Sequence, residues 1–332
     1  MPGVKALKKL QLGVESTAGI EVNATVIYRG LGGGVDSRTV VFPEEEVGNL
    51  VGLDRSYTSS HLAEIEFAET EATFEHLPYI LEAGVAAEVA TQDGAGSDYI
   101  YQYLWPTSAQ NTINTYTIEW GDDQQEYQST YCFVKDFTLT GAAGEALMAS
   151  ANWVGRAAAT GTYTAALAPL AVEEILFSKG TIDIDDTGTY PATTNKSSTL
   201  VSMELAVTTG FMEYRTADGQ LYFTAHKQVQ PEALLTVTFE HDGTATAEYA
   251  KFQSDTTRNI RLQFTGSAVT TPGTTYSNKE FIIDIIGRWE SFSALEDSDG
   301  NNQVTAVLRA RYETSDAASL RFIVVNELSA LT

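Results

Sequence analysis

The sequence predicts a mostly β protein made of two tandem β-barrels or sandwiches, each with one short flanking α-helix. Two observations lead to this fold class. Strand-like alternation of apolar and polar residues dominates the 332 residues, and Thr, Tyr, Gly and Ser are plentiful while charged residues make up only 19%. The two halves of the chain also run through the same order of segments, which indicates an internal repeat. We therefore expect a first barrel domain over residues 1–160 and a second over residues 161–332.

The first copy of the repeat opens with an alternating strand, Leu62–Glu69. Period-two alternation places Ile65 and Phe67 toward a core and points Glu64 and Glu66 away from it. A helix and four further strands follow, expected at Phe74–Ala86, Tyr99–Trp105, Thr115–Trp120, Tyr131–Thr140 and Leu147–Trp153.

The second copy opens with a strand at Leu234–Glu240. A helix and four strands again follow, expected at Ala245–Phe252, Asn259–Phe264, Glu280–Ile286, Val304–Tyr312 and Leu320–Val325. Ahead of this copy, Ile182 and Ile184 alternate with Asp183 and Asp185, which predicts one more strand with a buried face and an acidic face.

Some segments belong to neither copy. Residues 28–60 contain the glycine run Gly30–Gly34 and are interpreted as a long, flexible, functional loop. Its candidate contact residues are Val40, Val41, Phe42, Glu44, Glu45, Glu46 and Val47. Residues 157–172 are interpreted as a bridge between the copies, and Asp218-Gly219 and Asp299-Gly300 predict hairpin turns.

The sequence contains no catalytic, cofactor-binding or metal-binding constellation. The four histidines form no zinc-binding pair and are interpreted as surface or strand-end residues: His61, His76, His226 and His241. The Asp-rich stretches 183–188 and 297–301 lack the glutamate that completes a calcium loop, so turn chemistry is the better interpretation. Cys132 is the only cysteine, which excludes an intrachain disulfide and fits a reducing cytosol.

The formal net charge of −24 excludes a protein that binds nucleic acid through clustered Lys and Arg. Solubility would explain the charge, and so would a surface that faces a polyanion without binding it. Composition leaves both explanations open. No apolar run approaches the length of a membrane span.

Several short stretches resemble the tail tube proteins, or major tail proteins, of long-tailed bacteriophages. Leu12–Gly19 (LGVESTAG) is similar to the opening of that family, and Phe74–Leu81 resembles a short family helix that begins near a Leu-Pro pair. Thr115–Gly121 resembles the strand that follows, Val134–Gly155 a hairpin that ends in Val-Gly, and Asp183 stands where an Ile-Asp strand opens a second barrel.

This resemblance implies a structural virion protein, not an enzyme, that needs no cofactor. It implies stacked rings that form the tail tube, through which DNA passes without specific binding. Two barrels per chain would make a ring of three chains with pseudo-hexameric shape, and the loop at residues 28–60 would reach the adjacent ring. The implied partners are further copies of the chain, a tape measure protein and tail terminator or tip proteins. The implied location is the virion tail, after assembly in the host cytoplasm.

We expect the acidic strand residues Glu64, Glu66, Asp183 and Asp185 to line the channel. Two alternatives of other classes remain. A β-sandwich module that binds carbohydrate or a receptor would display an aromatic platform, whereas Trp105, Trp120, Trp153 and Trp289 lie in or beside strands, where burial is the better expectation. A polysaccharide-cleaving enzyme would need a pair of carboxylates across a cleft.

Overall fold

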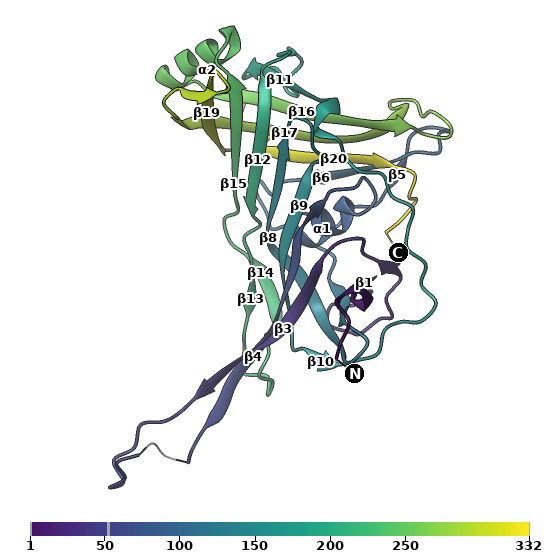
Figure 1. Cartoon of the computed structure of the whole chain (residues 1–332), viewed down its shortest axis with the longest axis vertical. Coiled ribbons are helices and arrows are strands. Elements are labelled where there is room, and N and C mark those ends of the chain that lie inside the picture. Colours follow the sequence, from purple (N-terminus) through teal and green to yellow (C-terminus); the bar gives the residue numbers. More distant parts are fainter. Residues whose placement is uncertain (1, 52–53, 332) are drawn as a thin grey trace.

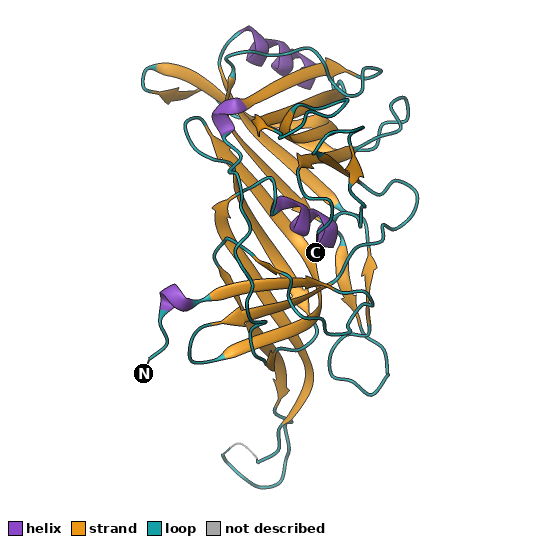
Figure 2. Ribbon diagram, turned by 90° about the vertical axis from the view of Figure 1, so that its right-hand side faces the viewer, coloured by secondary structure: helices purple, strands orange, loops and turns teal. Residues whose placement is uncertain are grey.

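Antiparallel strands dominate the computed structural model, which describes residues 2–51 and 54–331. One 18-stranded sheet and one two-stranded hairpin make up the fold (Figure 1). The molecule is elongated: α2 lies at one end, and the hairpin of β3 and β4 projects from the other (Figures 1 and 2). The prediction of a mostly β fold with two α-helices is confirmed.

The N-terminal half contains β1 (Lys9–Val14), β2 (Val26–Ile27), β3 (Gly32–Val41), β4 (Tyr57–Glu71), β5 (Thr91–Gln92), β6 (Tyr99–Leu104), β7 (Tyr116–Gly121), β8 (Glu126–Ala142), β9 (Met148–Gly155) and β10 (Ala159–Thr160). The C-terminal half contains β11 (Gly180–Asp186), β12 (Leu200–Thr208), β13 (Phe211–Tyr214), β14 (Ala225–Gln228), β15 (Glu232–Glu240), β16 (Arg258–Ala268), β17 (Asn278–Phe292), β18 (Glu296–Ser298), β19 (Asn301–Ala310) and β20 (Leu320–Asn326). The helices are α1 (Leu77–Gly84) and α2 (Gly243–Gln253), with short 3-10 helices at Lys5–Leu7 and Phe177–Lys179.

The pattern of strand pairing repeats between the two halves. In the first half β1 pairs with β7, β7 with β8, β8 with β9, β9 with β4 and β4 with β3. In the second half β11 pairs with β16, β16 with β17, β17 with β19, β19 with β15 and β15 with β12. Each helix follows the equivalent strand, α1 after β4 and α2 after β15.

The two long strands β8 and β17 carry the same irregularity. On β8 the register shifts at Lys135, between Val134 and Asp136, and on β17 it shifts at Glu290, between Trp289 and Ser291. A bulge bends its strand. The first part of β8 pairs with β7 and the second with β9, just as β17 passes from β16 to β19.

One sheet crosses the junction between the halves, because β12 pairs along the second part of β8. Alternation decides which residues are buried there: Leu139 of β8 lies opposite Leu205 of β12, and both are fully buried. The largest buried apolar cluster is accordingly continuous, with members from Leu10 of β1 to Val324 of β20.

The prediction of a flexible loop over residues 28–60 is wrong for much of that range. Residues Gly32–Val41 form β3, which pairs with β4 in the projecting hairpin. Its glycines serve close packing: an added Cβ would lie 2.5 Å from the Glu66 carbonyl oxygen at Gly32, and 2.8 Å from the Ile65 and Trp120 side chains at Gly34. A glycine allows such an approach because it has no Cβ.

Both predicted hairpin turns are present. Asp299 and Gly300 have φ of 52° and 90° and form the two-residue connection of β18 to β19. Positive φ at both positions is what a type I′ turn requires. Asp218 and Gly219 lie in the connection of β13 to β14.

Candidate functional site

The strands that cross the junction present one polar outer face. We define the acidic face by its carboxylates, which are Glu64, Glu66, Glu69 and Glu71 of β4, Asp136 of β8, Glu204 of β12, and Glu232 and Glu240 of β15. Opposite parity buries Ile65, Leu139 and Leu235 on the other side of the same strands. The face arises because polar residues alternate with core residues on every strand.

Pairing register aligns part of the acidic face in a row. Glu66 lies opposite Asn152, Asn152 opposite Asp136, Asp136 opposite Thr208, and Thr208 opposite Glu232. Asn152 Nδ2 donates to Asp136 Oδ1 at 2.6 Å. Adjacent strands lie about 4.8 Å apart, and a carboxylate stands on every second strand of this row, so carboxylates recur about every 10 Å.

Basic side chains at the margins of the acidic face are paired with carboxylates. Lys135 Nζ lies 3.5 Å from Glu213 Oε2, and Arg309 bonds Glu290 (Nε to Oε2, 3.0 Å) and Glu232. Each pair reduces the positive charge that a phosphate would meet. The face therefore carries a net negative charge, which repels polyanions.

Glu64 and Glu66 lie exposed on the acidic face, as the alternation of their strand predicts. Asp183 and Asp185 do not lie there, because β11 pairs with β16 and not with the strands that carry the face. Asp185 holds the following loop: its Oδ2 accepts the backbone N–H of Thr193 (2.7 Å) and of Thr194 (3.0 Å). Burial opposes ionisation of this carboxyl, but those hydrogen bonds outweigh it and lower its pKa.

The remaining members of the acidic face were missed in the sequence. Met203, Leu205 and Val207 stand two residues apart around Glu204, and this alternation could have predicted β12. Nothing local shows that Glu204 and Asp136 share a face with Glu66, since this follows from the pairing of β12 with β8.

The projecting hairpin and its tip, which we call the arm (described over residues 37–51 and 54–62), expose apolar side chains. Phe42 is 71% exposed and Val51 81%, and the exposed set also includes Val40, Val47, Leu50 and Tyr57. Val41 is half-buried in β3. Of the three predicted glutamates Glu44, Glu45 and Glu46, the middle one forms an ion pair with Arg55. Exposed apolar surface of this kind on a projecting element indicates a contact with another molecule.

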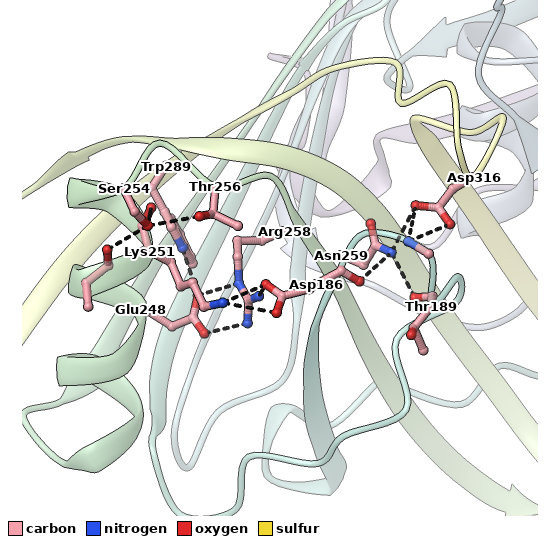
Figure 3. A network of polar contacts seen from close by, with 12 residues as sticks. Asp186, Thr189, Glu248, Lys251, Ser254, Thr256, Arg258, Asn259, Trp289 and Asp316 are labelled. Carbon is pink, nitrogen blue, oxygen red and sulfur yellow. Dashed lines mark hydrogen bonds and ion pairs between the residues drawn. The ribbon is translucent and has the colours of Figure 1, made fainter.

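A buried charge cluster anchors α2 to the sheet (Figure 3). Glu248 accepts two hydrogen bonds from Arg258 (Nε to Oε2, 2.9 Å; Nη2 to Oε1, 2.8 Å) and one from Trp289 Nε1 (2.9 Å). Lys251 reaches Asp186 at 2.8 Å. The Arg258 guanidinium and the Trp289 indole occupy the oxygens of the Glu248 carboxylate. This cluster is therefore a structural anchor rather than an acid–base pair.

Glu82 occupies the same place in α1, as the sixth residue of that helix, but within residues 2–51 and 54–331 it forms no ion pair with a cation. It accepts hydrogen bonds from Asn114 Nδ2 (2.7 Å) and the Tyr116 hydroxyl (3.1 Å). Burial raises the pKa of Glu82 to about 7 against the effect of both bonds. His76 precedes this helix and is buried, so its interpretation as a surface histidine is wrong. Burial, and then the nearby Arg29 charge, lowers the His76 pKa to about 4.

Within residues 2–51 and 54–331, no group of three or more His, Cys, Asp or Glu side chains could hold a metal ion. In the same residues no helix is long and apolar enough to cross a membrane. All four tryptophans are buried, as expected, and so provide no exposed aromatic platform.

Comparison with known proteins decides the family. A family model described as phage tail tube protein matches residues 9–323. The chain belongs to the phage tail tube protein family. No curated protein sequence matches it significantly. The resemblance seen in short stretches is thereby confirmed, and this tail tube protein is a non-enzymatic structural component of the virion tail. Membership also implies that it assembles with itself.

Proposed function

We propose that the tail tube protein forms closed rings of three chains, that the rings stack into a tube, and that the acidic face lines the channel through which DNA passes. The observation that carries this proposal is the repeated strand pairing, because it gives one chain two equivalent segments of a single wall. On this view the halves are the two tandem barrel domains, divided near residue 160.

The strand count supports three chains. The wall of one chain contains β3, β4, β9, β8, β12, β15, β19 and β17 in spatial order. Three chains would form a barrel of roughly 24 strands, whose backbone diameter is about 48 Å at a spacing of about 4.8 Å and a tilt of about 40°. Two chains would give about 32 Å, and inward side chains remove roughly 10 Å from either value. The wider channel leaves room for duplex DNA and its hydration.

The charge of the acidic face fits passage without binding. Every Lys or Arg in contact with a phosphate releases counterions and holds the DNA, whereas carboxylates make no such contact. A wall with paired cations and free carboxylates therefore lets DNA slide. Asp183 and Asp185 lie on β11 and contribute little to this wall in our proposal.

Stacking is proposed to use the arm. Burying Phe42, Val47 or Val51 against the next ring contributes about 1.5–3 kcal/mol for each side chain before the cost of ordering the segment. The contact of a single arm with the next ring is weak, but the contacts of all the arms of a ring together are strong. The tape measure protein and the terminator or tip proteins are the expected partners at the ends of the tube.

Electron microscopy and native mass spectrometry of the purified full chain test this function. We expect rings of three chains that stack into tubes as the protein concentration rises. Compact monomers at every concentration would refute self-assembly, and rings of six chains would refute the trimer while leaving the tube intact.

A further inference from the structure

The junction between the two halves shows how one copy meets the next. Within the chain, β12 covers the edge of β8: Leu205 lies opposite Leu139, and the pairing runs from Ser202–Ala142 to Thr208–Asp136. By the repeat of strand pairing, β12 is the counterpart of β3, and β8 is the counterpart of β17. Among the residues that the structure describes, the equivalent contact between β3 and the second part of β17 is not made.

The register of this missing contact follows from aligned rows of residues. In the first half Gly34, Ile65, Trp153 and Val134 lie opposite one another in sequence across β3, β4, β9 and β8. In the second half the corresponding row is Leu205, Leu235, Leu308 and Trp289, across β12, β15, β19 and β17. Val134 and Trp289 each stand immediately before a bulge. Gly34 therefore corresponds to Leu205, and Ala294, five residues beyond Trp289, corresponds to Leu139.

We propose that β3 of one copy pairs antiparallel with the edge formed by residues 291–296 of the next copy, with Gly34 opposite Ala294 and Val35 opposite Ser293. This inference rests on the proposed ring. The β8–β12 junction is then the interface between copies, reproduced inside a single chain. Sheet parity agrees with the register: Gly34 and Leu205 share the core side, and Phe292, like its counterpart Phe137, packs on the core.

Both edges are open in the single chain. In the described residues β3 pairs only with β4, and Ser291 and Phe292 pair only with β19. Near these edges Val35 is 61% exposed and Leu295 52%. Residues 293–295 interrupt the strand between β17 and β18, whereas residues 136–142 of β8, which β12 covers, form an uninterrupted strand. An unpaired edge is a template for another chain, and a closed ring leaves none unpaired.

One contact already touches the β3 edge. Trp120 Nε1 donates to the Gly34 carbonyl oxygen at 3.0 Å. A carbonyl oxygen has two lone pairs and can accept a second hydrogen bond from a neighbouring strand. The glycines at positions 32–34 leave no side chain beyond Cα to hinder that approach.

Cysteine cross-linking tests the register directly. Residues opposite one another in an antiparallel pair have Cα atoms about 4.5–5.5 Å apart, which suits a disulfide. The variant Val35→Cys/Ser293→Cys, in a Cys132→Ala background, should convert most of the assembled protein into covalent multimers on a non-reducing gel, and the ladder should end at the trimer. The matched control Val35→Cys/Asp297→Cys is displaced by four residues, or about 13 Å, and should give no ladder.

The outcomes separate this inference from the proposed function. If tubes form but the Val35–Ser293 pair does not cross-link, or if only the displaced control cross-links, the proposed register is overturned. The proposed tube function would then still stand. Absence of rings and tubes overturns the proposed function. If the cysteine variant does not fold, hydrogen exchange of the unmodified protein decides: amides of residues 32–36 and 291–296 should become at least tenfold slower to exchange on assembly, and unchanged exchange in tubes overturns the pairing.

Discussion

Replacing Glu82 by Gln should make the tail tube protein more stable at alkaline pH and leave it almost unchanged at acid pH. Burial raises the pKa of Glu82 from 4.5 to about 7. The folded chain therefore binds this proton more tightly than the unfolded chain. The stability that Glu82 contributes is complete below about pH 4.5 and is lost as the pH rises to about 7. The shift corresponds to about 3 kcal/mol at 1.36 kcal/mol per pKa unit.

Glutamine has nearly the shape of a protonated glutamate and can still accept from Asn114 and the Tyr116 hydroxyl, but it has no charge to desolvate. Urea unfolding at pH 5 and pH 8.5 measures the effect. The variant should exceed the natural chain by about 3 kcal/mol at pH 8.5 and by just under about 1 kcal/mol at pH 5. Glu64→Gln, at an exposed position of the acidic face, is the control. A Glu82→Gln effect that is equal at both pH values would refute the burial argument.

Four further predictions follow from the structure. The double variant Glu64→Lys/Glu66→Lys should preserve rings but slow DNA ejection, most strongly at low salt. Asp183→Lys should not slow ejection. If Asp183→Lys slowed ejection and the double variant did not, β11 would be placed on the channel. Arg258→Met should cost about 3–5 kcal/mol in unfolding experiments because Glu248 loses its cation, and the added change Glu248→Met should recover most of that loss. Gly34→Ala should cost about 1–3 kcal/mol because its Cβ meets Ile65 and Trp120, whereas Gly33→Ala, with open space around its Cβ, should cost little in the free subunit. Joining Thr39 to Ser60 through Asn-Gly removes most of the arm and should give folded rings that no longer stack, as seen by electron microscopy; normal tubes would place the stacking contact elsewhere.

Local pattern was sufficient for the strands and helices that it predicted, but it did not predict β3 or β12. Alternation such as Ile65 and Phe67 against Glu64 and Glu66 set which residues of β4 are buried. The Asp299-Gly300 pair specified its turn, because both residues tolerate positive φ. The repeated order of segments indicated a repeat but matched its strands one place out of step: the pairing matches β7, β8 and β9 with β16, β17 and β19, whereas β6 and β20 pair with each other outside the repeat. The short motifs indicated the family that the comparison confirmed.

Other features depended on contacts between distant segments. A glycine run can form either a flexible loop or a strand packed against a residue such as Trp120. Only the packing in the folded protein distinguishes the two structures. His76 and Glu82 are polar residues whose sequence does not show their environment; tertiary packing buries both, lowers the pKa of His76 and raises that of Glu82. The acidic face exists because β12 pairs with β8, which brings Glu204 beside strands more than sixty residues earlier in the chain. Period-two alternation states that two faces exist on each strand, but only the order and register of the strands determine which faces join into one surface.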